Sequence, residues 1–206
     1  DKTIRLLYQI FYDLQRLLDQ EGISYFIVGG TALGAVRHSG IIPWDDDIDI
    51  GIDHRDMKRI PDLKKRLEKC GYNLVKVWLG YKVCYRNIPP IGKYKYSFPN
   101  IDIFGYEHYK DKVRLDRQSC RDIWPKEYFY IEELYPLRKY QFGEFEVWGP
   151  YKCKEYFNRI YGKKWNVEAY REYDHEIEEE VEKPKRKKKS AEVTDQADDD
   201  SESLVA

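Results

Sequence analysis

The sequence predicts an α+β fold, in which helices flank a β-sheet and a charged segment follows the folded domain. Residues 3–20 place apolar side chains at helical spacing, so an amphipathic helix opens the chain. A short apolar run, residues 25–28, ends in Gly29-Gly30, which is typical of a buried strand followed by a turn. A second apolar run, residues 47–52, carries two acidic residues at strand spacing. Short strands alternating with helices in this order predict a sheet with helices packed on it.

Apolar periodicity and turn residues place the remaining elements. Further helices are expected over residues 31–36, 54–70 with an interruption at Pro61, and 150–161 with Pro150 at the start. Further strands are expected over residues 72–78, 81–86, 101–104, 138–142 and 144–148. Gly71 and Gly162 cap two of the helices, and the two hairpins turn at Leu79-Gly80 and at Gly143.

The composition changes after about Tyr173, which divides the chain into a domain over residues 1–175 and a tail over residues 176–206. The tail contains KPKRKKK, with six basic residues, and then an acidic stretch with almost no apolar side chains. Such a segment buries too little apolar surface to offset its ordering entropy, so we expect a disordered, charged tail. It is either a solvated tail without a specific role or a basic patch for polyanions or nuclear import.

Charge and hydropathy narrow the classes of partner. The 206 residues have a formal net charge of −1, so the sequence predicts no global attraction to nucleic acid. No apolar run approaches the roughly 18 residues that a membrane-spanning helix requires, so this chain is expected to contain no transmembrane segment.

Cysteine usage bears on the compartment. The four cysteines are widely spaced and form no CxxC pair, which argues against structural zinc and favours reduced, mostly buried thiols. The cysteines are Cys70, Cys84, Cys120 and Cys153. This pattern favours the cytoplasm, while a secretory lumen stays open because a segment that precedes Asp1 could carry an anchor.

Asp47 and Asp49 are the first candidate functional residues. In a strand, residues i and i+2 point to the same face, about 6.6–6.8 Å apart along the backbone. Two like charges on one face are unfavourable unless a positive charge lies between them. A divalent cation with oxygen ligands meets that requirement, and Mg²⁺ or Mn²⁺ is expected. The preceding diglycine would bring backbone N–H groups close to a phosphate.

Asp102 is the third acid, in the strand segment NIDIF. A buried acid between isoleucines must be paired with a cation, hydrogen-bonded or bound to metal. An ion pair with Arg or Lys is one interpretation, and membership of the metal site is the other. Gly-Gly, then Asp-x-Asp, then a single strand Asp is the order of motifs in nucleotidyltransferases. That resemblance implies a nucleotidyltransferase-like mixed sheet flanked by helices, with two metal ions about 3.5–4 Å apart between the three acids.

A narrower resemblance follows from GGTALGAVRHSGIIPWDDDIDIGI and from WGPYKCKEYFNRIYGKKW near the end of the domain. Both segments resemble the LicD family, which includes bacterial phosphocholine transferases and is related to fukutin and fukutin-related protein. The resemblance spans roughly residues 3–165, although the stretch 80–136 matches nothing recognisable and is where we expect acceptor choice. It implies a metal-dependent phosphotransferase that moves phosphocholine or a polyol phosphate from a CDP-linked donor to a glycan.

The resemblance also implies roles for the acids. Asp47 and Asp49 match the metal-binding pair, and Asp45 matches a further acid that often precedes the pair. Asp46 fills a more variable slot. Asp102 would be a metal ligand or the general base for the acceptor hydroxyl, so Asp47, Asp49 and Asp102 are the expected catalytic residues.

The diglycine segment supplies the expected phosphate-binding residues, which are Gly29, Gly30, Thr31, Arg37 and His38. For Arg37, a salt bridge to one of the neighbouring acids is an equal alternative, and for His38 a plain loop role is favoured. Trp44 is expected to pack, with base stacking as the alternative, and Gly162 and Trp165 are expected to be structural.

Two other functions stay open on the sequence alone. A true nucleotidyltransferase that modifies a small molecule, a protein or RNA would use the same three acids. A catalytically inactive binding module could keep the fold, although the presence of all three acids and both glycines argues against it. The reaction that the LicD resemblance implies is in-line attack of an acceptor hydroxyl on phosphorus, with release of CMP.

Overall fold

A computed structural model describes residues 2–167, 173–174 and 179–180. Its centre is a seven-stranded sheet in the order β1-β2-β5-β4-β3, with β6 added to β5 and β7 added to β6. The strands are β1 (Tyr25–Ile27), β2 (Ile48–Asp53), β3 (Tyr72–Val77), β4 (Gly80–Tyr85), β5 (Asn100–Tyr109), β6 (Lys112–Leu115) and β7 (Tyr128–Tyr130). The β2–β5 pair is parallel and the other pairs are antiparallel, so the predicted mixed sheet is confirmed.

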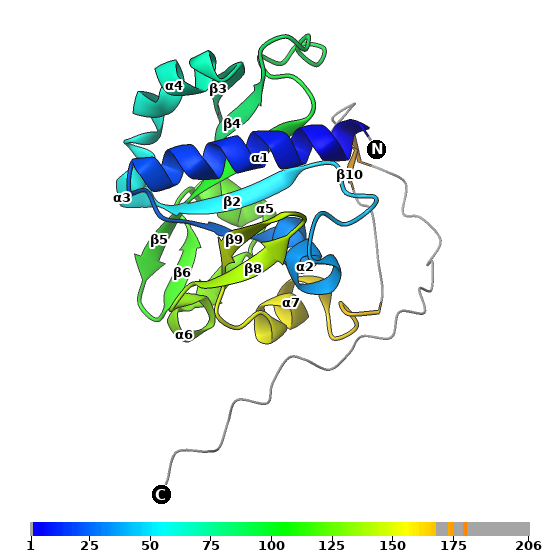
Figure 1. Ribbon diagram of the computed structural model, residues 1–206. Coiled ribbons are helices and arrows are strands. Elements are labelled where there is room, and N and C mark those ends of the chain that lie inside the picture. Colours follow the sequence, from blue (N-terminus) through cyan, green and yellow to red (C-terminus); the bar gives the residue numbers. More distant parts are fainter. Residues whose placement is uncertain (1, 168–172, 175–178, 181–206) are drawn as a thin grey trace, which may run out of the picture.

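Helices and a separate hairpin surround this sheet (Figure 1). The helical elements are α1 (Lys2–Gln20), α2 (Gly29–His38), α3 (His54–Met57), the 3₁₀ helix η1 (Ile60–Leu63), α4 (Lys64–Lys69), α5 (Gln118–Ile123), α6 (Ile131–Leu134) and α7 (Lys154–Tyr161). The hairpin is β8 (Arg138–Phe142) with β9 (Phe145–Gly149), and a two-stranded ribbon pairs β10 (Tyr173–Asp174) with β11 (Glu179–Glu180). The rest of the predicted tail lies outside the described residues.

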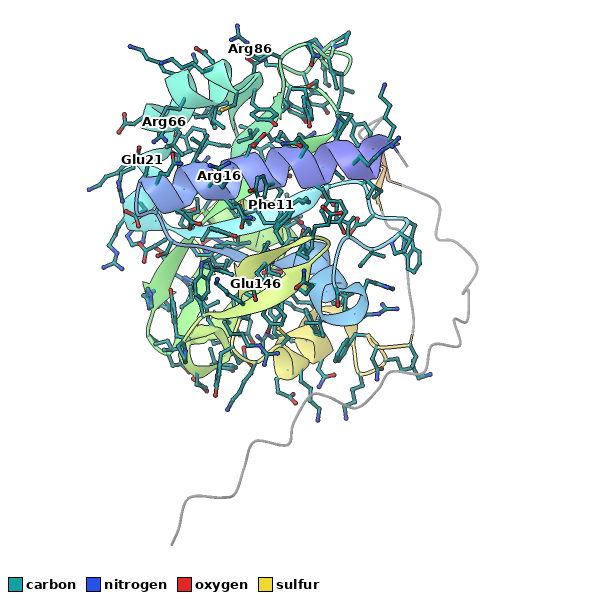
Figure 2. All side chains as sticks on the ribbon, in the orientation of Figure 1. Phe11, Arg16, Glu21, Arg66, Arg86 and Glu146 are labelled. Atoms are coloured by element: carbon teal, nitrogen blue, oxygen red, sulfur yellow. The ribbon has the colours of Figure 1, made fainter. Side chains whose placement is uncertain are left out.

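The α1 helix crosses the sheet and supplies much of the core (Figure 1). Its predicted apolar stripe is buried, and the alternating isoleucines of β2 are fully buried as well. Phe11 points from α1 toward the β8–β9 hairpin, which carries Glu146 (Figure 2), and its ring packs edge-on against Phe142 at 5.6 Å. At the far end of α1, Glu21 forms an ion pair with Arg66 of α4 (Figure 2). The strand period of two therefore directs the isoleucines of β2 into the core on one face of the sheet and Asp49 to the opposite face.

Several predicted boundaries are wrong for identifiable reasons. The second helix begins at Gly29 rather than at residue 31, because the two glycines form its first turn. The expected helix over residues 54–70 is split into α3, η1 and α4, with Pro61 in the 3₁₀ turn where its missing N–H costs nothing. The last helix begins at Lys154, not at Pro150, because Tyr151 and Lys152 donate backbone hydrogen bonds to α6.

The central stretch contains structure that the sequence did not predict. The β5 strand runs to Tyr109, well past the expected residues 101–104, and β6, α5, β7 and α6 follow it. All four cysteines are free thiols, and three of them are buried. Within the described residues, no helix combines the length and the apolar composition needed to cross a membrane.

Candidate active site

The first turn of α2 lies against the acidic segment because Gly29 and Gly30 have no side chains. Gly29 has φ +53°, and a Cβ atom there would lie 3.4 Å from Oδ2 of Asp49. A Cβ atom on Gly30 would lie 2.8 Å from Oδ2 of Asp45. The diglycine therefore brings two carboxylates to the N-terminus of a ten-residue helix, where backbone N–H groups favour negative charge.

Asp45, Asp46 and Asp47 form a compact group of carboxylates just before β2. Each residue offers a carboxylate oxygen, and these atoms lie within 4.8 Å of one another, which is close enough to share one metal ion. Asp46 is 8% exposed, and the sequence had assigned it only a variable slot. The structure thus adds Asp46 to the candidate ligands beside the predicted Asp45 and Asp47.

Asp49 and Asp102 face one another across the parallel β2–β5 pair. On the other side of Asp102, β4 places Lys82 directly opposite. Nζ of Lys82 lies 2.6 Å from Oδ1 of Asp102, in an ion pair whose side chains are 5% and 7% exposed. The lysine pairing that the sequence left open is present, and the register also brings Asp102 beside Asp49, as the metal-site interpretation requires.

Asp49 lies among several other negatively charged side chains. Burial raises the pKa of its carboxyl well above the usual range, and the charges of Asp47, Asp102 and Asp45 raise it further. Lys82 acts in the opposite direction and lowers it. The acids Asp45, Asp46, Asp47, Asp49 and Asp102 offer only oxygen ligands, the donor set that Mg²⁺ and Mn²⁺ prefer, so the site fits such an ion.

A second network, which sequence reasoning missed, joins α7 to the start of α2. The N–H of Gly29 donates to Oη of Tyr156 at 2.9 Å, and that hydroxyl donates to Oε1 of Glu127 at 2.7 Å. Oη of Tyr106 donates to the same oxygen at 2.8 Å. The amide of Gly29 therefore has a hydrogen-bond acceptor within the protein, and its contact with a donor phosphate stays a prediction. Glu127 lies in the stretch without recognisable motifs, so no local sequence signal marked it.

The predicted phosphate-binding residues have structural contacts of their own. Oγ1 of Thr31 accepts a hydrogen bond from the N–H of Asp49 at 2.8 Å, which fixes β2 against α2. Nη1 of Arg37 donates to the carbonyl of Trp165 at 3.1 Å, and the ring of His38 packs edge-on against Trp44 at 6.0 Å. Their contacts with a donor phosphate, and that of Gly30, stay predictions.

Two residues that were expected to be structural do have structural contacts. Gly162 ends α7 with φ +83°, a conformation that glycine adopts without strain. Trp165 packs against Phe157 with ring centroids 4.9 Å apart.

A comparison with protein-family models matches residues 22–152 to the LicD/FKTN/FKRP nucleotidyltransferase domain. The chain belongs to this family. An uncharacterised protein of Rickettsia prowazekii is 40% identical over 155 residues, which are 75% of this chain and 53% of that protein. The lipopolysaccharide cholinephosphotransferase LicD of Haemophilus influenzae is 47% identical over 47 residues, 23% of this chain and 18% of that enzyme. The chain thus spans about half the length of the Rickettsia relative and less of the enzyme.

Among solved structures, ANT(2'')-Ia in complex with adenylyl-2''-tobramycin aligns with 77% of this chain and 87% of its own, at 12% identity and a TM-score of 0.47. The LicD-family match contains the five acids and Lys82, but it ends before α7. Tyr156, which binds the Gly29 amide, is therefore supplied from outside the matched region.

Tyr156→Phe tests whether α7 holds the start of α2. The variant removes the acceptor of the Gly29 N–H and one donor to Glu127, and leaving buried polar groups unsatisfied costs about 1–3 kcal/mol. We expect the free energy of unfolding, measured with urea, to fall by about that amount. Tyr151→Phe is the matched control, because its side chain is 41% exposed. Equal unfolding curves for the two variants would contradict the role of Tyr156.

Glu127→Gln tests the buried carboxyl through the pH dependence of stability. Burial raises the pKa of Glu127 above 4.5, although the hydrogen bonds from Tyr156 and Tyr106 lower it. Because the folded pKa is raised, wild-type stability falls as pH rises from about 4.5 through the folded pKa, and glutamine has no charge to lose. The free energy of unfolding of the wild-type protein should therefore decrease relative to that of Glu127→Gln as the pH rises from 5 to 8. Glu132→Gln, at an exposed position, should show no such trend.

Proposed function

We propose that this domain is a metal-dependent phosphotransferase that moves a phospho-alcohol, of the phosphocholine or polyol phosphate class, from a CDP-linked donor to a glycan. One observation supports it most directly: a LicD-family domain gathers Asp45, Asp47 and Asp49 at the N-terminus of α2. Asp102 stands beside Asp49 on the next strand. Membership of the family supports the reaction class, and the acids supply what that class requires.

The acids would hold Mg²⁺ or Mn²⁺, which, when bound, would neutralise negative charge on the donor phosphates. Asp47 and Asp49 are the principal ligands in this proposal, with Asp45 beside them. Asp102 would accept the proton of the acceptor hydroxyl or complete the ligand set. The hydroxyl oxygen then forms the new bond to phosphorus, the bond to the leaving CMP oxygen breaks, and the first turn of α2 faces the developing charge.

The experiment that tests this function is thermal unfolding of the purified protein with Mg²⁺ or Mn²⁺. Each metal is tested alone and with CDP-choline, CDP-ribitol, CTP, ATP or UTP. A ligand that binds only the folded state stabilises it, by about 2.7 kcal/mol at a concentration 100 times Kd, and so raises the melting temperature. We expect a metal-dependent shift with one CDP-alcohol, and its loss in Asp47→Asn.

Other outcomes point to other functions. A shift with nucleoside triphosphates alone would replace the proposal with a true nucleotidyltransferase. No shift with any compound would favour a binding module that has lost activity. Release of CMP from the CDP-alcohol that binds, measured with candidate glycans, then identifies the acceptor class.

A further inference from the structure

Lys82 is an almost completely buried lysine in the middle of the sheet, inside the candidate active site. Its side chain is 5% exposed, and Nζ lies 2.6 Å from Oδ1 of Asp102 and 3.0 Å from Oδ1 of Asn100. The ring of Tyr96 lies 4.8 Å from the same nitrogen, in a cation–π contact. An ammonium group is costly to bury unless it is paired with an anion and hydrogen-bonded. Lys82 has an ion pair and a hydrogen bond, and the cation–π contact is a third.

The position of this ammonium is fixed by more than Asp102. Asn100 lies two residues before Asp102 on β5, and its Nδ2 donates to the carbonyl of Ser97 at 3.1 Å. That hydrogen bond orients the amide so that its oxygen faces Lys82. The lysine is therefore held by two side chains of β5, Asp102 and Asn100, and by the ring of Tyr96 in the segment before that strand.

The charges of the site divide into two groups. Asp45, Asp46 and Asp47 can share one ion before β2. Asp102, one strand further from β1 than Asp49, already has a cation at contact distance. A second divalent ion bridging Asp49 and Asp102 would have to approach the fixed ammonium of Lys82, and the repulsion between the two cations opposes its binding.

We propose that Lys82 is a built-in cation that takes the place of a second metal ion, so that the site binds a single divalent ion at the Asp45–Asp49 side. This inference rests on the proposed metal-dependent function and refines it, because the sequence resemblance implied two ions. Lys82 is then a positioning residue: it holds Asp102 in place and neutralises its charge, while the single ion serves Asp47 and Asp49.

The test counts bound Mn²⁺ by electron paramagnetic resonance, in which the signal of free Mn²⁺ is measured during a titration of the metal alone. We expect the wild-type protein to bind one Mn²⁺ per chain and Lys82→Met to bind two, because methionine keeps the length of the side chain and removes its charge. Lys82→Arg, which keeps the charge, should bind one. Lys76→Met is the matched control on an exposed position of β3 and should also bind one.

Each outcome decides the question. Two ions on the wild-type protein, or equal counts for wild type and Lys82→Met, would overturn the role of Lys82 and leave the proposed transferase function intact. No bound ion at all would overturn the metal-dependent function together with this inference. If Lys82→Met fails to fold, Lys82→Gln removes the charge, keeps a hydrogen-bond donor and should bind two ions, and the wild-type count still distinguishes one ion from two.

Discussion

Asp49→Asn is expected to reduce phosphotransfer by at least about 10²–10³-fold, a loss typical of removing one group that stabilises transition-state charge. The same substitution should raise the melting temperature of the metal-free protein. The folded state raises the pKa of Asp49, so ionising it at neutral pH costs about 1.4 kcal/mol for each pKa unit, and asparagine avoids that cost. Each kcal/mol recovered corresponds to about 2–4 °C in a domain of this size.

Opposite effects on stability and activity distinguish a metal site from a structural cluster. The measurement is thermal unfolding with and without Mg²⁺, where the wild-type protein should gain stability from the ion and Asp49→Asn should gain little. Asp19→Asn, on an exposed position of α1, is the control and should behave as wild type in both conditions. A lower melting temperature for metal-free Asp49→Asn would contradict the electrostatic argument, and retained turnover would remove Asp49 from the catalytic residues.

The sequence could predict the parts of this site that depend on local periodicity. Spacing alone placed Asp49 on the strand face opposite to Ile48 and Ile50, and both isoleucines are fully buried in the structure. It also identified Asp102 as an acid among isoleucines, and the parallel register does place it opposite Asp49. The strand face of Asp49 could be predicted because a strand has a period of two and needs no information from distant residues. The position of Asp102 opposite Asp49 was an expectation from the resemblance to nucleotidyltransferases and not from spacing.

Contacts between distant strands could not be predicted in the same way. Lys82 meets Asp102 only because β4 pairs with β5 in one particular register, and YKVCY contains no sign of that register. Glu127 reaches Tyr156 and Tyr106 from a segment between two elements of six and three residues, α5 and β7. Elements this short have too few residues to show a period, so the stretch 80–136 gave little signal.

The local geometry before β2 was also outside the reach of a strand argument. The predicted strand began at Asp47, but β2 begins at Ile48 and the three preceding acids lie in a loop. A loop can turn consecutive side chains toward one point, as Asp45, Asp46 and Asp47 do here. The candidate ligand set therefore depends on where the strand begins, and the sequence placed that boundary one residue too early.

Gly30→Ala is expected to weaken Mg²⁺ or Mn²⁺ binding by about 10–100-fold, the range for changes that displace a metal ligand, while the fold stays at least as stable. A Cβ atom on residue 30 would lie 2.8 Å from Oδ2 of Asp45, which is the mobile end of a side chain, so the carboxylate moves and the backbone does not. Alanine also favours a helix over glycine by up to about 1 kcal/mol. Calorimetric titration with Mn²⁺ measures the affinity, and urea unfolding measures the stability.

A double-mutant cycle shows whether the effect of Gly30→Ala passes through Asp45. If the new methyl group acts by displacing that carboxylate, then Gly30→Ala should cost no further affinity once Asp45→Ala has removed the displaced atoms. Effects of two substitutions that act through one contact do not add, whereas independent effects add to within about 0.3–0.5 kcal/mol. Full additivity of the two losses would therefore show that Gly30 contributes by another route, such as direct contact between its backbone N–H and a donor phosphate.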